Sequence, residues 1–213
     1  MTPDNHPEPL TRALSWDNCA LLTNSLKPYA CCRHTHAADY CAQLLRGEHR
    51  LEPEHITRIV DHTYQVAVNT VDNPEPSTPY GYKFSGQYCT AAMLVYGHLG
   101  ESAFTPEATS DPRVRRLMDK ITLVCDPELE ASYQADRNRW AHRLEVTLED
   151  GRVLTRQVEY PYGDFNNPFT WAYEHEKFHT LADGVLGPDR VAALVERLPH
   201  LAVSYTPLTL PTT

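Results

Sequence analysis

The sequence has no apolar run approaching the roughly 18 residues that a membrane-spanning helix needs, so we expect no membrane segment. It also lacks an excess of positive charge. Its 28 acidic residues outnumber 19 basic ones, and the net charge of −9 argues against general nucleic-acid binding. The six cysteines form no C-x-x-C pair, and Cys31 and Cys32 are adjacent, so we expect buried thiols and no metal site. Residues 1–9 are polar and proline-rich, unlike a signal peptide, and a reducing cytoplasm is expected.

One short stretch concentrates positive charge in this acidic chain. Residues 27–36, the basic segment, read Lys-Pro-Tyr-Ala-Cys-Cys-Arg-His-Thr-His and contain no acid. Charges of one sign focus the electrostatic field on ligands of the opposite sign. The residues that follow read as a helix, whose first free amides favour anions and whose expected cap is Thr35. The sequence therefore predicts an anion site built on Lys27, Arg33, His34 and His36.

The chemistry open to the basic segment is the recognition of carboxylates. Fixed cations hold a substrate with several carboxylates and stabilise the charge that develops when a proton is removed beside one. An imidazole or a desolvated lysine can be tuned near neutral pH to move that proton. The alternative is structural, with one of His34 and His36 in the core and the other on the surface. Tyr88 likewise fits either a binding role or a packed core aromatic.

The pattern of apolar residues predicts an α+β fold, in which an antiparallel sheet of about four strands is packed by helices. Strands are expected at 56–68 and 121–125 and in a hairpin of 144–148 with 153–160, joined by a tight turn at Asp150-Gly151. Helices are expected after residue 35 and over 85–97, 171–186 and 189–198. The helix at 85–97 is apolar or small nearly all round, so it should be buried.

A second motif lies in the expected helix at 171–186. His175-Glu176-Lys177-Phe178-His179 matches the H-E-x-x-H pattern of zinc peptidases, which places two imidazoles on one helical face. The other interpretation is a charged, solvated helix face, because a short pattern with three fixed positions arises easily in a chain with 11 histidines. We favour the solvated face and expect no metal there.

Several segments together resemble the 2-methylcitrate dehydratase family, within the MmgE/PrpD superfamily. The resemblance is carried by Lys27–Asp39, Lys83–Leu94, Asp111–Arg115, Lys120–Asp126, the hairpin around Asp150-Gly151, and Tyr162–Pro168. It covers residues 13–198. The family includes 2-methylcitrate dehydratases, cis-aconitate decarboxylases and iminodisuccinate epimerases, which all act at a carbon next to a carboxylate without a metal or organic cofactor.

The resemblance implies roles for single residues. Lys27 corresponds to the family's active-site lysine and His36 to its neighbouring histidine, so both are expected to be catalytic. We expect Arg33, His34 and Tyr88 to bind the polycarboxylate substrate. In some members of the family a tyrosine also contributes to the active site. The aligned residue in this chain is Thr70, so we expect no tyrosine in that role.

The resemblance also implies that this chain holds half of an active site. Family members carry a large N-terminal helical domain, and their active site lies between it and an α+β domain like this one. We therefore expect a partner helical domain, in cis or in trans, and a homodimer, and we expect the chain alone to be inactive or very weak. The alternatives are a decarboxylase or epimerase domain of the same family, or a non-catalytic subunit that needs a separately encoded N-terminal partner.

Four segments are expected along the chain. They are a leader at 1–26, the α+β domain at 27–165, C-terminal helices at 166–202 that would return to the helical domain, and a tail at 203–213. The tail nearly reproduces the translation of a common sequencing adapter, so we expect it to be non-native.

Overall fold

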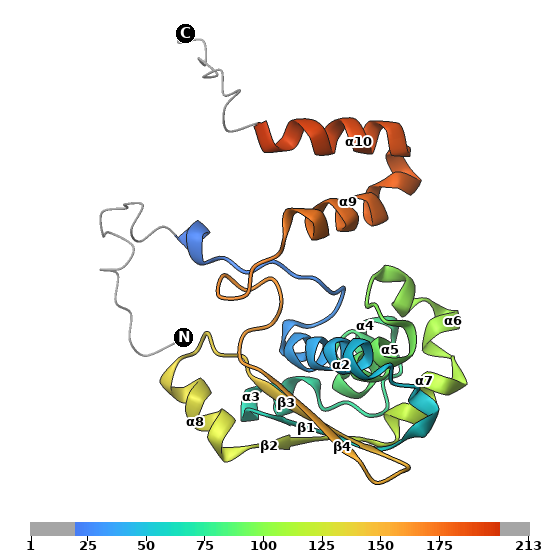
Figure 1. Ribbon diagram of the computed structural model, residues 1–213, viewed down its shortest axis with the longest axis vertical. Coiled ribbons are helices and arrows are strands. Elements are labelled where there is room, and N and C mark those ends of the chain that lie inside the picture. The colour runs from blue at the N-terminus through green and yellow to red at the C-terminus, as the bar shows by residue number, and fades with distance from the viewer. Residues whose placement is uncertain (1–19, 201–213) are drawn as a thin grey trace. The chain divides into compact units, whose positions relative to one another are not determined.

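The computed structural model describes residues 20–200, which form parts of two compact units, 1–168 and 169–213 (Figure 1). The expectations for the start of the leader and for the 203–213 tail lie outside the described residues. No helix between residues 20 and 200 is long and apolar enough to cross a membrane.

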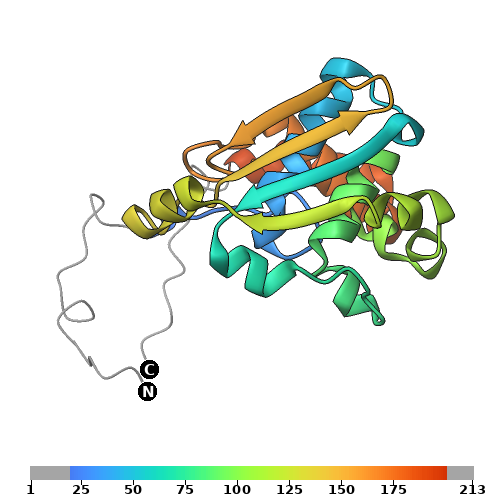
Figure 2. The ribbon, with the colours of Figure 1, turned by 90° about the horizontal axis from the view of Figure 1, so that it is seen from below.

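A four-stranded sheet organises the first unit, with the strand order β2-β1-β3-β4 (Figure 2). The strands are β1 (Ile56–Thr63), β2 (Ile121–Cys125), β3 (His142–Leu148) and β4 (Val153–Val158). The β1–β3 and β3–β4 pairs are antiparallel, as expected, whereas β1 and β2 run parallel. The α+β prediction is confirmed, and the sheet is mixed rather than wholly antiparallel.

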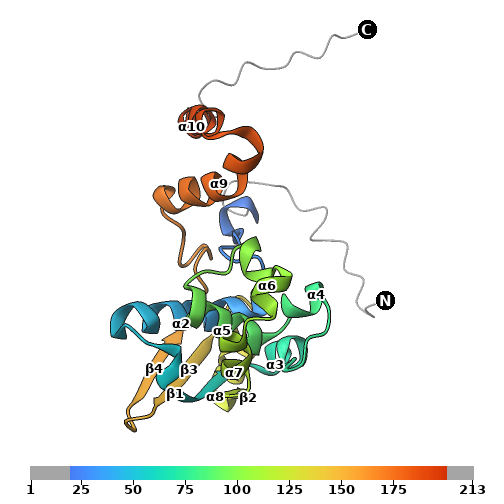
Figure 3. The same ribbon diagram turned by 90° about the vertical axis from the view of Figure 1, so that its right-hand side faces the viewer.

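Helices cover one face of this sheet. The helix α2 (His36–His49) packs against β3 and β4, and α5 (Gly86–Tyr96) packs against α2 and β2 (Figure 3). A third helix, α7 (Pro112–Met118), packs on α5. The predicted buried helix is confirmed in α5: Ser85 caps its start, and Gly97 ends it at a φ of 78°, which favours glycine.

The core fills the space between the sheet and these helices. Ile59 is fully buried on β1, between Ile121 on β2 and Val146 on β3. Burying such a side chain completely stabilises a protein by about 1.5–3 kcal/mol. On β3 the buried residues alternate with half-buried polar ones, so the sheet presents one apolar face to the helices.

Shorter elements connect this framework. They are η2 (Ala20–Thr23), η3 (Arg33–Thr35), η4 (Pro53–His55), α3 (Gln65–Val71), α4 (Pro79–Tyr82), η5 (Glu101–Phe104), α6 (Pro106–Thr109) and α8 (Pro127–Ala135).

The first expected strand is shorter than predicted. It ends at Thr63, and residues 65–71 form α3 instead. Valine-rich sequence favours a strand, but here Ala67 and Val71 are buried on one face of the helix, four residues apart. Tertiary packing therefore overrides the local preference for extended backbone.

The predicted hairpin is present, with a wider turn than expected. The Leu148 amide donates to the Arg152 carbonyl (2.9 Å), so three residues rather than two separate the paired positions. Gly151 has a φ of 84°, the left-handed conformation that closes a three-residue hairpin loop.

The second unit contains two predicted helices that pack on each other, α9 (Trp171–Leu186) and α10 (Pro188–Arg197), followed by the short η6 (Leu198–His200). Gly187 joins the helices at a φ of 83°. Val191 of α10 is buried, whereas several large apolar side chains of this unit, Trp171 and Val185 among them, are exposed.

Candidate functional site

The chain leading into α2 is fixed in place by hydrogen bonds to three distant segments. The Leu26 amide donates to the Gly163 carbonyl, the Ala30 amide to a carbonyl at residue 99, and the Cys32 amide to a carbonyl at residue 83, each at 2.8 Å. Backbone bonds of this kind hold a loop in one conformation, because each satisfies polar groups that would otherwise need water. The basic segment is therefore a positioned loop.

Arg33 forms an ion pair that the local sequence does not reveal. Its Nη2 lies 2.7 Å from Asp164 Oδ2, and the Ser25 hydroxyl donates to the same oxygen at 2.8 Å. The guanidinium also lies 5.2 Å from the ring centroid of Trp140. Burial lowers the pKa of Arg33, and the charge of Asp164 opposes that shift. Folding thus brings an acid into a segment that has none of its own.

His34 is a neutral group in this environment. Its ring stacks on Trp140, with 4.5 Å between centroids and 7° between planes, and its Nδ1 lies 2.7 Å from the Tyr64 hydroxyl. Burial, followed by the charges of His142 and Arg33, lowers the pKa of His34 to about 4. At neutral pH this imidazole carries no charge, so His34 adds nothing to the positive charge of the basic segment.

Lys27 and His36 meet at one backbone carbonyl. The exposed Lys27 donates from Nζ to the Cys31 carbonyl oxygen at 3.1 Å, and His36 Nε2 lies 3.4 Å from the same oxygen. His36 is completely buried, with its ring edge against Tyr29 at 5.2 Å. The structure therefore brings the two predicted catalytic residues together, with the lysine at the surface and the histidine beneath it.

The expected cap at the start of α2 is wrong. The Thr35 side chain makes no capping hydrogen bond to the helix amides. Its hydroxyl instead donates to Asp39 Oδ2 at 2.7 Å and lies 2.9 Å from the Cys32 carbonyl oxygen. The residues of the first turn, 36–39, are all buried, so this helix start faces protein rather than solvent.

A buried group of thiols surrounds that first turn. Cys31 Sγ lies 3.2 Å from Thr35 Oγ1 and 3.6 Å from Asp39 Oδ2. Burial opposes ionisation of Cys31, but the influence of Cys89, His36 and Thr35 outweighs it and holds its pKa well below the ordinary value. Burial, reinforced by the charge of Cys31, raises the pKa of Asp39 well above its usual range.

Tyr88 lies in the core rather than at the surface. It is completely buried, its hydroxyl donates to the Ala103 carbonyl, and its ring packs edge-on against Tyr82 at 4.8 Å. The geometry fits the packed-aromatic interpretation, and the chain as folded does not bring Tyr88 to the surface beside Lys27.

A polar network that the sequence did not single out lies beneath His34. His142 Nδ1 lies 2.7 Å from Asp61 Oδ1, and His142 Nε2 lies 3.0 Å from Thr63 Oγ1, with all three residues buried. The rings of His142 and Tyr64 meet edge-on at 6.1 Å. Isolated polar residues in strands give no sequence signal of such a pairing, because the partners come from β1 and β3.

The H-E-x-x-H motif does not assemble a metal site in the part of the chain that the structure covers. His179 Nδ1 pairs with Asp183 Oδ1 at 3.0 Å. Between residues 20 and 200, one group of three close His, Cys, Asp or Glu ligands is found, and it does not include this motif. The solvated-face interpretation fits these contacts.

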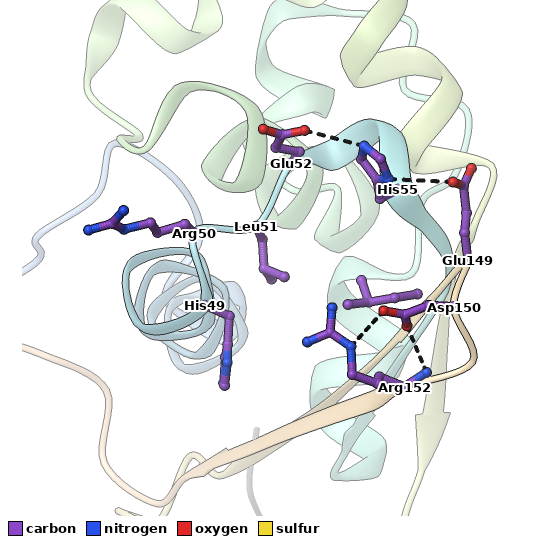
Figure 4. Close-up of a pocket in the computed structure, with 9 residues that line it drawn as sticks. His49, Arg50, Leu51, Glu52, His55, Glu149, Asp150 and Arg152 are labelled. Carbon is purple, nitrogen blue, oxygen red and sulfur yellow. Dashed lines mark hydrogen bonds and ion pairs between the residues drawn. The ribbon is translucent and has the colours of Figure 1, made fainter.

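A hollow of about 530 Å³ opens at the other end of β1, away from the basic segment (Figure 4). Five of its lining residues form ion pairs with one another: His55 lies 3.3 Å from Glu52 and 3.5 Å from Glu149, and Arg152 lies 2.6 Å from Asp150. None of the predicted site residues lines it. We therefore place the candidate site at the basic segment.

Comparisons with known proteins point to one family. The chain is 32% identical over 136 residues to a mitochondrial 2-methylcitrate dehydratase of Yarrowia lipolytica, covering 61% of this chain and 26% of that protein. It is 35% identical over 111 residues to a 2-methylcitrate dehydratase of Cupriavidus necator, covering 51% of this chain and 23% of that protein. The chain thus spans about a quarter of the length of these relatives. Because residues 29–200 match the model of the MmgE/PrpD C-terminal domain, this chain belongs to the MmgE/PrpD family.

Proposed function

We propose that this chain supplies one wall of the active site of a lyase that acts next to a carboxylate of a polycarboxylate such as 2-methylcitrate. The observation that carries the proposal is the positioned loop on which Lys27 and Arg33 present two cations beside the neutral imidazole of His34. Two relatives named 2-methylcitrate dehydratase support the choice of substrate class.

In the proposed dehydration, a base removes a proton from the carbon next to a carboxylate. The hydroxyl group on the adjacent carbon then takes up a proton and leaves as water, and the electron pair of the broken C–H bond forms a carbon–carbon double bond. Negative charge builds up on the carboxylate during the first step, and a fixed cation at that position lowers the barrier. We assign this role to the exposed amine of Lys27.

The other residues of the site take roles that follow from their contacts. We assign the binding of a second carboxylate to Arg33, whose guanidinium is held in place by the ion pair with Asp164. His34, uncharged at neutral pH, contributes a hydrogen bond rather than a charge. His36 holds the Cys31 carbonyl that Lys27 also binds, and so orients the lysine.

This wall needs a complementary one. Catalysis depends on holding the reacting atoms in a fixed geometry that excludes water, and one loop does not enclose a substrate. We propose that a helical domain, in cis or in trans, completes the site, that the complete enzyme is a homodimer, and that the chain alone turns over substrate very slowly.

Reconstitution tests the proposal. The full chain would be mixed with a separately produced N-terminal part of the Cupriavidus necator relative and assayed with 2-methylcitrate, cis-aconitate and iminodisuccinate. We expect turnover of one substrate only in the mixture, and loss of that turnover with Lys27→Met. Each component alone, and the mixture with His55→Ala at the far end of β1, serve as controls. Activity that survives Lys27→Met contradicts the proposal, as does full activity of the chain alone.

A non-catalytic subunit is the second candidate, favoured by the complete burial of His36, which leaves Lys27 at the surface without the other predicted catalytic residue. It predicts a stable complex with the helical part but no turnover of any of the three substrates. Size-exclusion chromatography of the same mixture separates this outcome from a simple failure to associate.

A further inference from the structure

Three ligand-bearing side chains converge at the junction of the basic segment with α2 and α5. Cys31, Asp39 and Cys89 each offer one ligand atom, and these atoms all lie within 4.8 Å of one another. Cys31 precedes η3, Asp39 lies in the first turn of α2, and Cys89 lies in α5. All three residues are buried. Their grouping is therefore not explained by contact of polar side chains with solvent or by pairing with a charge at the surface.

The group has unused binding capacity. Asp39 Oδ1 is buried and makes no hydrogen bond within the described structure, although Oδ2 of the same carboxyl accepts from Thr35. The Nδ1 atom of the neighbouring His36 is also buried without a hydrogen-bond partner. Buried polar atoms are normally satisfied, and those that are not call for an explanation such as an ion.

We propose that Cys31, Asp39 and Cys89 bind a zinc ion, with His36 beside them. Zinc is coordinated by thiolate, carboxylate and imidazole ligands, usually four in a tetrahedron. Two sulfurs favour zinc over magnesium or calcium, which take oxygen ligands. Three protein ligands leave a fourth position, for which we propose the unpartnered Nδ1 of His36.

The surroundings resemble those of a structural metal site. Thr35 holds Asp39 through its hydroxyl, as outer-shell groups hold metal ligands in place. An ion here would join the loop that carries Lys27 to the two central helices of the domain. The adjacent Cys32 takes no part, so the spacing of cysteines along the chain does not predict the site.

Cobalt spectroscopy tests the proposal on the full chain, reduced and stripped of metal with a chelator. Cobalt(II) serves as the probe because tetrahedral thiolate sites give intense visible bands and a sulfur-to-cobalt charge-transfer band in the near ultraviolet. We expect one cobalt per chain with both features, and their loss when zinc is added. A weak octahedral spectrum without the charge-transfer band overturns the proposal.

Matched variants locate the ion. Cys31→Ser and Cys89→Ser should each weaken zinc binding by about 100-fold or more, since changes in outer-shell groups alone cost 10–100-fold. The controls are Cys125→Ser, which changes an exposed cysteine, and His179→Ala, which changes the H-E-x-x-H motif. Circular dichroism checks that each variant folds. Loss of binding in His179→Ala, or its retention in a folded Cys31→Ser variant, overturns the assignment.

A measurement on the unmodified protein covers the case in which the serine variants do not fold. Bound zinc should slow alkylation of Cys31 and Cys89 by a maleimide, read by peptide mass spectrometry, and should leave the exposed Cys125 unaffected. Equal alkylation rates with and without zinc contradict the proposal.

Discussion

The two ends of strand β1 carry the same kinds of side chain in different settings. At the Thr63 end, His142 and Asp61 lie 2.7 Å apart with 1% and 2% of their side chains exposed. At the Ile56 end, His55 and Glu149 lie 3.5 Å apart, each with 60% exposed. Water and salt weaken the second pair, whereas the first is held in a medium that screens little. Burial, rather than residue type, therefore distinguishes the pair beneath His34 from the pair in the charged hollow.

The largest expected effect follows from removing one partner of the buried pair. His142→Ala leaves Asp61 as an uncompensated buried carboxylate and should lower the free energy of unfolding by about 3–5 kcal/mol. Urea denaturation followed by circular dichroism measures it. The matched change at the other end, His55→Ala, should stay within about 0.5 kcal/mol. Similar losses in the free energy of unfolding of the two variants would show that the two ends of β1 do not differ in this respect.

Asp164→Asn should have an intermediate effect. It replaces the charge that pairs with Arg33 and weakens the bond from Ser25, so we expect a loss of about 1.5–3 kcal/mol in the free energy of unfolding. The control is Asp150→Asn, which changes an exposed pair with Arg152 and should have a much smaller effect. Equal midpoints of denaturation in the two variants would show that the buried pair of Asp164 stabilises the fold no more than the exposed pair of Asp150.

The low pKa of His34 makes stability depend on pH in a defined direction. Burial lowers this pKa to about 4 in the folded state, below the ordinary histidine value of about 6.5 in the unfolded chain. Between these values the unfolded chain binds more protons, so stability should fall as the pH falls from about 6.5 to 4. His34→Gln should flatten this part of the profile. An NMR titration of the His34 ring with a midpoint near 6.5 would contradict the assignment.

The smallest expected effect on stability comes from Lys27→Met. Its side chain is exposed, so the free energy of unfolding should change by no more than about 0.5 kcal/mol. Binding of 2-methylcitrate by the reconstituted enzyme should nevertheless be lost, and calorimetry measures it. A large drop in stability would mean that Lys27 is structural rather than functional.

Local signals explain which elements the sequence predicted. Ser85 and Gly97 mark the ends of α5, and the alternation of β3 leads into a turn with Gly151, so each element carries its own boundaries. The strand predicted over 56–68 was too long because Val66 and Val68 favour extended backbone locally, while burial of Val71 requires a helix.

The partners of the basic segment had no local signal. Asp164 and Trp140 are more than 100 residues away along the chain from Arg33 and His34, and only folding brings them together. The sequence therefore predicted which residues are basic but not which of them stay charged. The same reason hid the group formed by Cys31, Asp39 and Cys89, whose third member comes from a different helix.

The parallel pairing of β1 and β2 has a consequence for synthesis of the chain on the ribosome. Ile59, in the central strand, pairs with Ile121 and Val146, so both neighbours of β1 are translated long after it. Such distant pairings delay folding, because the intervening chain must be ordered before any contact compensates for the lost entropy. Until residue 125 has left the ribosome, β1 has no partner at either edge, and until residue 148 has left, the edge that pairs with β3 stays unpaired. Chaperones that cover exposed strands would have their greatest effect in that interval.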